Sequence, residues 1–84
     1  MIKLMYFARL KESLGLSHEM ITIPSEIKDV AKLIHWLSSR GALWEKEFGG
    51  TRIIRAAINL NLVANTAEIN DGDEIALFPP VTGG

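Results

Sequence analysis

Hydrophobic and polar positions change their period several times along the chain, and each change predicts a different element. Residues 2–8 alternate in the manner of an apolar-rich strand. Residues 9–14 then suit a short helix, and Gly15 is the type of residue that ends many helices. Residues 19–23 alternate again and stop at Pro24, which cannot continue a strand ladder. The opening segment therefore predicts a hairpin whose connection contains a helical turn.

A longer amphipathic helix follows, since apolar residues recur at spacings of three and four, the period of one helix face. This stripe consists of Ile27, Val30, Leu33, Ile34 and Leu37. Ser25 and Asp29 both have the side-chain chemistry of an N-cap, and Gly41 is expected to end the helix. Residues 42–48 are expected to add another helical turn, which the glycines after them break.

The second half of the chain predicts three short strands joined by turns. Residues 53–59 and 62–64 form the first two, with a turn at residues 60–61 between them. Residues 70–73 combine Asx side chains with a glycine, which is a strong turn signal, and residues 74–78 form the last strand. Two strands, a helix and three strands in this order suit an α+β fold, with one main helix packed across a mixed sheet.

Composition narrows the class of protein. The chain has 84 residues, of which 48% are hydrophobic, so it is one small domain with enough apolar side chains for a core. Its formal net charge of −1 predicts no general affinity for nucleic acid or membrane lipid. There is no cysteine for disulfides, thiolate catalysis or zinc ligation. Neither a signal peptide nor a membrane-spanning run is recognisable, so we expect a cytoplasmic protein.

The most specific chemical signal is the last segment, residues 79–84. Its two prolines stiffen it toward polyproline II, and Gly83 and Gly84 carry no side chains. An extended segment of this length spans about 20 Å, so it can carry the carboxylate of Gly84 into a narrow channel of another protein. A frayed end is the alternative reading of two terminal glycines. We expect a folded domain over residues 1–78 and a flexible tail over residues 79–84.

Three stretches of the chain resemble the small-subunit family of molybdopterin synthase, whose members are ubiquitin-like sulfur carriers. The sharpest resemblance is in residues 70–84, where the Phe-Pro-Pro-Val-Thr-Gly-Gly end is far more specific than a pair of glycines. Residues 2–12 with Gly15, and residues 57–63, match as well, so the resemblance covers essentially the whole length. It implies a β-grasp fold and a carrier that is not catalytic by itself.

The resemblance also implies a reaction at the backbone end. In the family, a ubiquitin-activating-like adenylyltransferase joins the terminal carboxylate to AMP from Mg-ATP, and sulfur from a persulfide relay then displaces AMP. The thiocarboxylate carrier docks on the large synthase subunit, in a heterotetramer, and gives its sulfur to cyclic pyranopterin monophosphate to build the molybdopterin dithiolene. Carried over to this chain, Gly84 bears the reacting carboxylate, no cofactor is bound, and ATP is used by the partner. The other tail residues that enter the channel are Pro79, Pro80, Val81, Thr82 and Gly83.

The family's partner-binding patch matches Phe7, Leu62 and Phe78 in this chain, with Lys11 beside them. Core packing is the alternative reading of the three apolar residues. Departures from close relatives lie mainly in residues 38–52, whose role the resemblance leaves open. Two other functions also stay open. One is a sulfur carrier for another pathway, such as thiamine synthesis or tRNA thiolation, and the other is a ubiquitin-like modifier or interaction module, joined to lysines or used for binding alone.

Other candidate sites in the sequence carry weaker signals. His18 and His35 have no paired ligand spacing, so a metal site is not expected. The carboxylates of residues 71–74 lack the remaining positions of a calcium loop, which favours a turn. Trp36 and Trp44 suit either an interaction surface or partial burial in the core.

Overall fold

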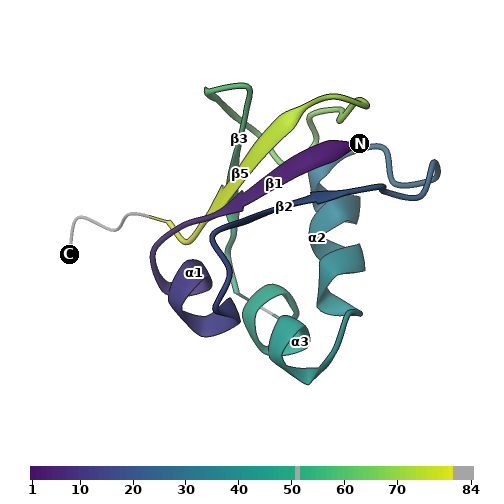
Figure 1. The fold of residues 1–84 in the computed structure, drawn as a ribbon. Helices are drawn as coiled ribbons and strands as arrows, with labels where there is room; N and C mark the ends of the chain where they lie inside the picture. Colours follow the sequence, from purple (N-terminus) through teal and green to yellow (C-terminus); the bar gives the residue numbers. More distant parts are fainter. Residues whose placement is uncertain (51, 81–84) are drawn as a thin grey trace.

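A computed structural model describes residues 1–50 and 52–80 of the chain. Its strands are β1 (Ile2–Tyr6), β2 (His18–Ile21), β3 (Arg55–Ile58), β4 (Asn61–Val63) and β5 (Glu74–Phe78). Its helices are α1 (Arg9–Leu14), α2 (Val30–Ser38) and α3 (Ala42–Phe48). The strands form one sheet in the order β2-β1-β5-β3-β4, in which β1 and β5 run parallel and the other neighbours antiparallel. The helices gather on one side of the sheet (Figure 1), which confirms the predicted α+β architecture.

Side-chain and glycine caps set the helix boundaries. Gly15 ends α1 in the left-handed conformation, at φ 66°, as the sequence predicts. Asp29, one of the two predicted caps, begins α2: its carboxylate accepts a hydrogen bond from the backbone N–H of Lys32 at 2.8 Å. The prediction that Gly41 ends this helix is wrong, because α2 stops at Ser38 and Gly41 instead precedes α3.

The early end of α2 follows from two serines in its last turn. The Ser39 hydroxyl donates to the Trp36 carbonyl oxygen at 2.6 Å, and the Ser38 hydroxyl donates to that of His35. The backbone N–H of Ser39 also bonds to the Trp36 carbonyl, three residues back. Carbonyls that are occupied in this way tighten the last turn and leave the helix without a continuing ladder.

The turn between β3 and β4 lies one residue earlier than the sequence predicts. Asn59 and Leu60 occupy its central positions with φ of 49° and 73°, as in the two-residue turns that suit antiparallel hairpins. Asparagine tolerates this conformation, and its side chain is held on both sides. Its Nδ2 donates to Asp73 Oδ1 at 3.1 Å, and its Oδ1 accepts from the Glu74 N–H at 3.0 Å. Asn59 therefore fixes the turn and lets β4 begin at Asn61.

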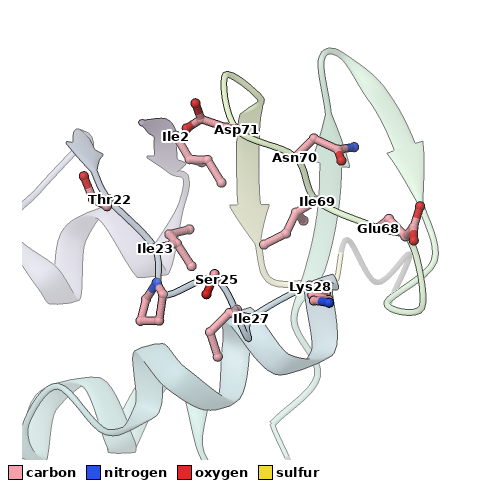
Figure 2. A pocket seen from close by; sticks show the side chains of 11 residues that line it. Ile2, Thr22, Ile23, Ser25, Ile27, Lys28, Glu68, Ile69, Asn70 and Asp71 are labelled. Atoms are coloured by element: carbon pink, nitrogen blue, oxygen red, sulfur yellow. The ribbon is translucent and has the colours of Figure 1, made fainter.

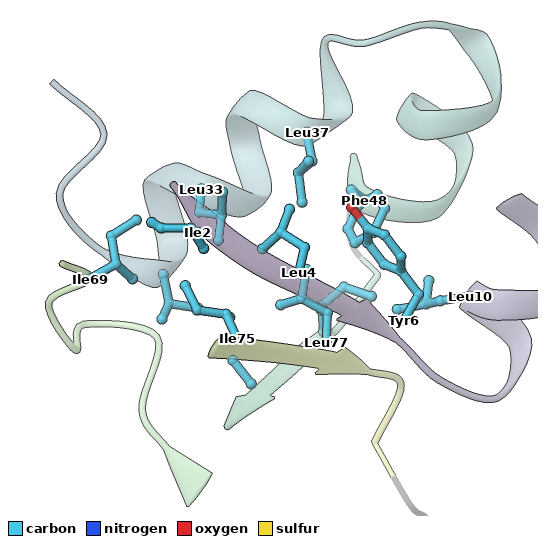
Figure 3. Packing of buried hydrophobic residues seen from close by; sticks show 13 residues of the cluster. Ile2, Leu4, Tyr6, Leu10, Leu33, Leu37, Phe48, Ile69, Ile75 and Leu77 are labelled. Atoms are coloured by element: carbon cyan, nitrogen blue, oxygen red, sulfur yellow. The ribbon is translucent and has the colours of Figure 1, made fainter. Parts of the chain in front are cut away.

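One layer of apolar side chains fills the space between the sheet and the helices (Figure 3). Alternate residues of β1 and β5 face this layer, so that Leu4 and Leu77 are completely buried. Leu33 and Leu37 meet them from one face of α2, four positions apart. The buried hydrophobic residues of the described chain are Ile2, Leu4, Tyr6, Leu10, Val30, Leu33, Leu37, Phe48, Ile54, Ala56, Ile69, Ile75 and Leu77.

The region of residues 38–52, whose role the sequence leaves open, supplies one wall of this core. Phe48 is buried, and Trp44 stacks on it with ring centroids 5.8 Å apart. Tyr6 of β1 meets both rings edge-on, with centroids 5.8 Å from that of Trp44 and 6.3 Å from that of Phe48. Trp36 also packs against the core as a partly buried residue. Of the two readings of the tryptophans, partial burial is confirmed.

An ion pair closes the core at the polar end of Tyr6. The Tyr6 hydroxyl donates to Glu19 Oε2 at 2.7 Å, and Arg40 donates to both oxygens of the same carboxylate at 2.8 and 3.2 Å. The Arg40 guanidinium also lies 4.2 Å from the ring centroid of Trp44. Burial and the neighbouring Glu19 carboxylate raise the pKa of the Tyr6 hydroxyl, so this residue remains a neutral donor.

Candidate functional site

The face of the sheet opposite the helices carries an apolar row. The strand register places Met5 beside Ala76, Ala76 beside Ala57, and Ala57 beside Leu62, so the row crosses four strands. These positions alternate with the buried ones and therefore point away from the core. We call this surface the open face, and define it by Met5, Phe7, Ala57, Leu62, Ala76 and Phe78.

The three apolar residues predicted to bind partners all lie on the open face. Phe7 is 46% exposed and Leu62 is 64% exposed, which excludes core packing for both. Phe78 is half-buried and alternates with the buried Leu77, so its side chain lies on the outer side of β5. Large apolar side chains that gather in this way mark a surface for another molecule. Partner binding by these residues stays a prediction.

Two hollows lie along the open face, one beside β1 and one at the end of β5. The first, of about 200 Å³, lies beside Phe7 and Met5 and is bordered by Lys11 of α1. The second, of about 260 Å³, is lined by Arg55, Leu62, Phe78 and Pro80. Lys11, the fourth residue predicted to bind partners, is exposed and lines the same hollow as Phe7. Each hollow combines an aromatic ring with at least one cationic side chain.

The C-terminal segment leaves the sheet beside the second hollow. β5 ends at Phe78 because Pro79 and Pro80 have no N–H group to donate to a neighbouring strand. Both prolines are half-buried, and Pro80 forms part of the wall of the second hollow. The remaining tail residues of the prediction, Val81, Thr82, Gly83 and Gly84, lie outside the described residues. The structure therefore places the start of the tail at the end of the open face.

A larger hollow, of about 450 Å³, lies at the other end of the sheet (Figure 2). Isoleucine side chains from three segments line it, including Ile2, Ile27 and Ile69, and Lys28 and Glu68 add charged groups. The parallel strands β1 and β5 begin at this end, whereas the tail leaves from the end of β5. We therefore place the candidate site on the open face and not in this hollow.

A buried carboxylate fastens α1, which carries Lys11, to α3. Glu47 is 2% exposed, and its Oε1 accepts from Arg9 Nε at 3.2 Å while its Oε2 accepts from Ser13 Oγ at 2.9 Å. The guanidinium of Arg52 lies 3.9 Å from Glu47 Oε1. This cluster holds the corner between β1 and α1, which borders the first hollow, against the rest of the domain.

Sequence reasoning missed Glu47. A glutamate in a short amphipathic helix is usually solvated. Its two hydrogen-bond partners, Arg9 and Ser13, are 38 and 34 positions away along the chain. No local pattern in the sequence carries that pairing.

The pKa of the Glu47 carboxyl makes the stability of the fold depend on pH. Burial alone would raise the pKa of its carboxyl, but the hydrogen bonds from Ser13 and Arg9, with the charge of Arg52, outweigh burial and lower the pKa below its ordinary value. A carboxyl whose pKa is lower in the folded state stabilises the fold above its unfolded-state pKa of about 4.3. That contribution is lost as the pH falls through the folded-state pKa.

Glu47→Gln is expected to lower the free energy of unfolding by about 1–3 kcal/mol near neutral pH, because a neutral amide replaces a charged acceptor. Below about pH 4 the wild-type protein loses the same contribution, so the two proteins should converge in stability. Urea unfolding followed by tryptophan fluorescence across this pH range measures both free energies. A difference that stays constant with pH would contradict the electrostatic role of Glu47.

Other candidate chemistry can be placed as well. His18 and His35 are both exposed, and the predicted turn near residues 70–73 is confirmed, with Gly72 at φ 90°. Within residues 1–50 and 52–80, no three histidine, aspartate or glutamate side chains gather to hold a metal ion. No helix in this same part of the chain has the length and apolar character needed to cross a membrane.

Comparison with known proteins finds a matching family and several relatives of this chain. The model of the ThiS family matches residues 4–84. The chain is similar to the molybdopterin synthase sulfur carrier subunit of Escherichia coli (strain K12), with 32% identity over 84 residues that cover all of both chains.

Solved structures share the fold. The putative molybdopterin converting factor, subunit 1, of Pyrococcus furiosus superposes with a TM-score of 0.73 and 30% identity, over 95% of this chain and 97% of that one. A complex of subunits 1 and 2 of molybdopterin-converting factor from Helicobacter pylori 26695 contains a chain with a TM-score of 0.63 and 26% identity, over 99% and 98%. Small archaeal modifier protein 1 of H. volcanii gives 0.70 and 26%, over 95% and 97%. These likenesses confirm the predicted β-grasp fold.

Proposed function

The chain belongs to the ThiS family, and from this premise we propose that it is the sulfur carrier subunit of a molybdopterin synthase. The observation that carries the proposal is the position of the tail. β5 runs along the open face and leads directly into Pro79 and Pro80, so a partner bound to the open face lies where the tail begins. The E. coli relative that bears this name, matched along its full length, supports the same function.

The proposed reactive group is the carboxylate of Gly84. A carboxylate is a poor electrophile at neutral pH, because its charge repels nucleophiles. We propose that a ubiquitin-activating-like adenylyltransferase activates it: a carboxylate oxygen attacks the α-phosphorus of ATP, and pyrophosphate leaves. The terminal sulfur of a persulfide donor then attacks the acyl carbon and displaces AMP, which gives an acyl disulfide. A thiol next cleaves its S–S bond, which leaves a thiocarboxylate on Gly84 and a disulfide between the thiol and the donor. We also propose a cytoplasmic location, where ATP is available to this partner.

The second half of the proposed cycle takes place on a larger partner. The thiocarboxylate reaches cyclic pyranopterin monophosphate in the active site of the large synthase subunit, and two carriers supply the two sulfurs of the dithiolene. The complex of subunits 1 and 2 from Helicobacter pylori supports a large-subunit partner of this kind. A heterotetramer of two carriers and two large subunits is the proposed assembly. In this cycle the carrier needs no catalytic side chain and no bound cofactor of its own.

A modifier of other proteins is the second candidate, because small archaeal modifier protein 1 is similar to this chain over 95% of its length. Both functions begin with an adenylated glycine carboxylate, and they differ in the nucleophile that displaces AMP. A sulfur nucleophile gives a thiocarboxylate, whereas a lysine amine gives an amide bond to another protein. A carrier for thiamine synthesis or tRNA thiolation would share the thiocarboxylate and differ only in the acceptor.

The test is an intact-mass measurement in two steps. The protein is first incubated with an adenylating enzyme of the family, ATP and a persulfide donor, and we expect its mass to rise by the difference between a sulfur and an oxygen atom. The loaded protein is then mixed with the large synthase subunit and cyclic pyranopterin monophosphate, and we expect the mass to return to its first value as molybdopterin forms. Omission of ATP is the control for the first step.

Each function predicts a different outcome of this measurement. Loading without transfer to the pterin would favour a carrier for another pathway. High-mass lysine conjugates without a thiocarboxylate would favour the modifier. A mass that never changes in the presence of ATP would overturn the proposal that Gly84 is activated.

A further inference from the structure

Arg55 occupies an unusual place on the open face. It lies on β3 directly opposite Phe78 in the strand register, two positions before Ala57, so it points to the same side as both. Its side chain lines the second hollow with Leu62 and Pro80, next to the start of the tail. A cationic group is therefore set within an apolar surface, and Arg55 is exposed there.

Each of the other arginines of the described chain lies within 4 Å of a carboxylate. Arg9 and Arg52 lie within 4 Å of Glu47, and Arg40 pairs with Glu19. Within residues 1–50 and 52–80, no carboxylate lies at that distance from Arg55. Among these described residues, its guanidinium makes no side-chain hydrogen bond either, so none of them occupies its donors.

The charge on the open-face side has the opposite sign to that of the chain. Lys3 and Lys11 border the first hollow and Arg55 borders the second, whereas Glu74 is the carboxylate on this side of β5. The chain as a whole has a formal net charge of −1. The cations therefore concentrate around the apolar row, where they favour an approaching surface that carries carboxylates.

A partner that covers the open face removes water from the Arg55 guanidinium. A buried guanidinium without an anionic partner is strongly unfavourable, whereas a carboxylate matches its donors in a bidentate pair. We infer that Arg55 forms an ion pair with a carboxylate of the large synthase subunit, at the rim of the surface that receives the tail. This inference rests on the proposed function, and it assigns to the partner an aspartate or glutamate beside an apolar patch.

The test is titration of the large synthase subunit with four forms of the full-length chain, by calorimetry at low and at moderate salt. Arg55→Glu is expected to weaken binding by about 100-fold or more, since it places two carboxylates next to each other. Arg55→Lys is expected to weaken it by about 3–10-fold, since lysine keeps the charge but lacks the paired donors of the guanidinium. Lys32→Glu is the matched control, because it reverses the charge of an exposed residue of α2, on the helix side of the sheet. It should change affinity by less than about threefold at moderate salt, where distant charges are screened.

Circular dichroism of each variant confirms that the domain is folded. Wild-type affinity in Arg55→Glu would overturn the ion pair and leave the proposed function intact. Equal losses in Arg55→Glu and Lys32→Glu would also overturn it, because they would show a general field and no local contact. No binding by the wild-type chain would overturn both. A large-subunit variant with one acidic residue changed to arginine, which restores binding to Arg55→Glu, would identify the carboxylate and support the pair.

Discussion

Gly83→Val is expected to abolish sulfur loading and sulfur transfer while the domain remains folded. Gly83 follows the two prolines that end β5, and glycine has no side chain to bury, so we expect the change to leave the buried layer intact. A β-branched side chain there restricts the backbone and adds width to a segment that must pass through a channel. Because a displacement of about 1 Å from the reactive geometry costs on the order of 100-fold in rate, we expect loading to fall by at least that factor.

The matched control for this change is Ala31→Val, which adds a β-branched side chain at an exposed position of α2, away from the tail. It should load and transfer sulfur at close to the wild-type rate. Removal of Gly84 should be as severe as Gly83→Val, because it shifts the carboxylate by one residue. Loading is measured by intact mass and transfer by molybdopterin formation. Loading of Gly83→Val at the wild-type rate would show that the channel accepts a side chain at this position.

The sequence predicted the elements whose signals are local. Residues 74–78 alternate between two faces and meet a proline, and β5 has these bounds in the structure. The short helix at residues 9–14 was recognisable because Gly15 ends it with a backbone angle that glycine adopts freely. The face of the candidate site was also predictable in outline. Phe7 and Leu62 match positions of the family's patch, and the sheet register brings both to one side.

Most of the features that were missed depend on contacts between distant segments, whereas the early end of α2 comes from local hydrogen bonds of Ser38 and Ser39. The turn lies at Asn59 because Asp73 and Glu74, at the point where β5 begins, form hydrogen bonds with its side chain. Glu47 looked like a solvated helix residue until Arg9 and Ser13 came to it from α1. Arg55 was missed because its position opposite Phe78 depends on how β3 pairs with β5. Pairings of this kind are fixed by tertiary packing, which composition and periodicity do not encode.

Neighbouring residues of β5 have different roles, one in the stability of the fold and one in the proposed binding of a partner. Leu77 faces the core and is fully buried, whereas its neighbour Phe78 lies on the open face and lines the second hollow. Two adjacent residues of similar hydrophobicity therefore serve different purposes, set only by the alternation of a strand. This arrangement gives each residue a matched control in the next one.

Phe78→Ala is expected to weaken binding to the large synthase subunit by about tenfold or more. Covering an aromatic side chain contributes about 1.5–3 kcal/mol, and about 1.4 kcal/mol corresponds to a factor of ten in affinity. Since the ring is already outside the core, the free energy of unfolding should change by less than about 1 kcal/mol. Leu77→Ala should do the reverse: it removes a buried side chain and should cost about 2–5 kcal/mol of stability.

Thermal melting and calorimetric titration on the same samples separate the two effects. A loss of about 1 kcal/mol lowers the melting temperature of a domain of this size by about 4–8 °C, so Leu77→Ala should melt far below the wild-type protein while Phe78→Ala melts close to it. Affinity is compared per folded molecule, at a temperature where both variants are folded. If Phe78→Ala melts as early as Leu77→Ala and its folded fraction binds the large subunit normally, Phe78 acts in the core and the open face is not the docking surface.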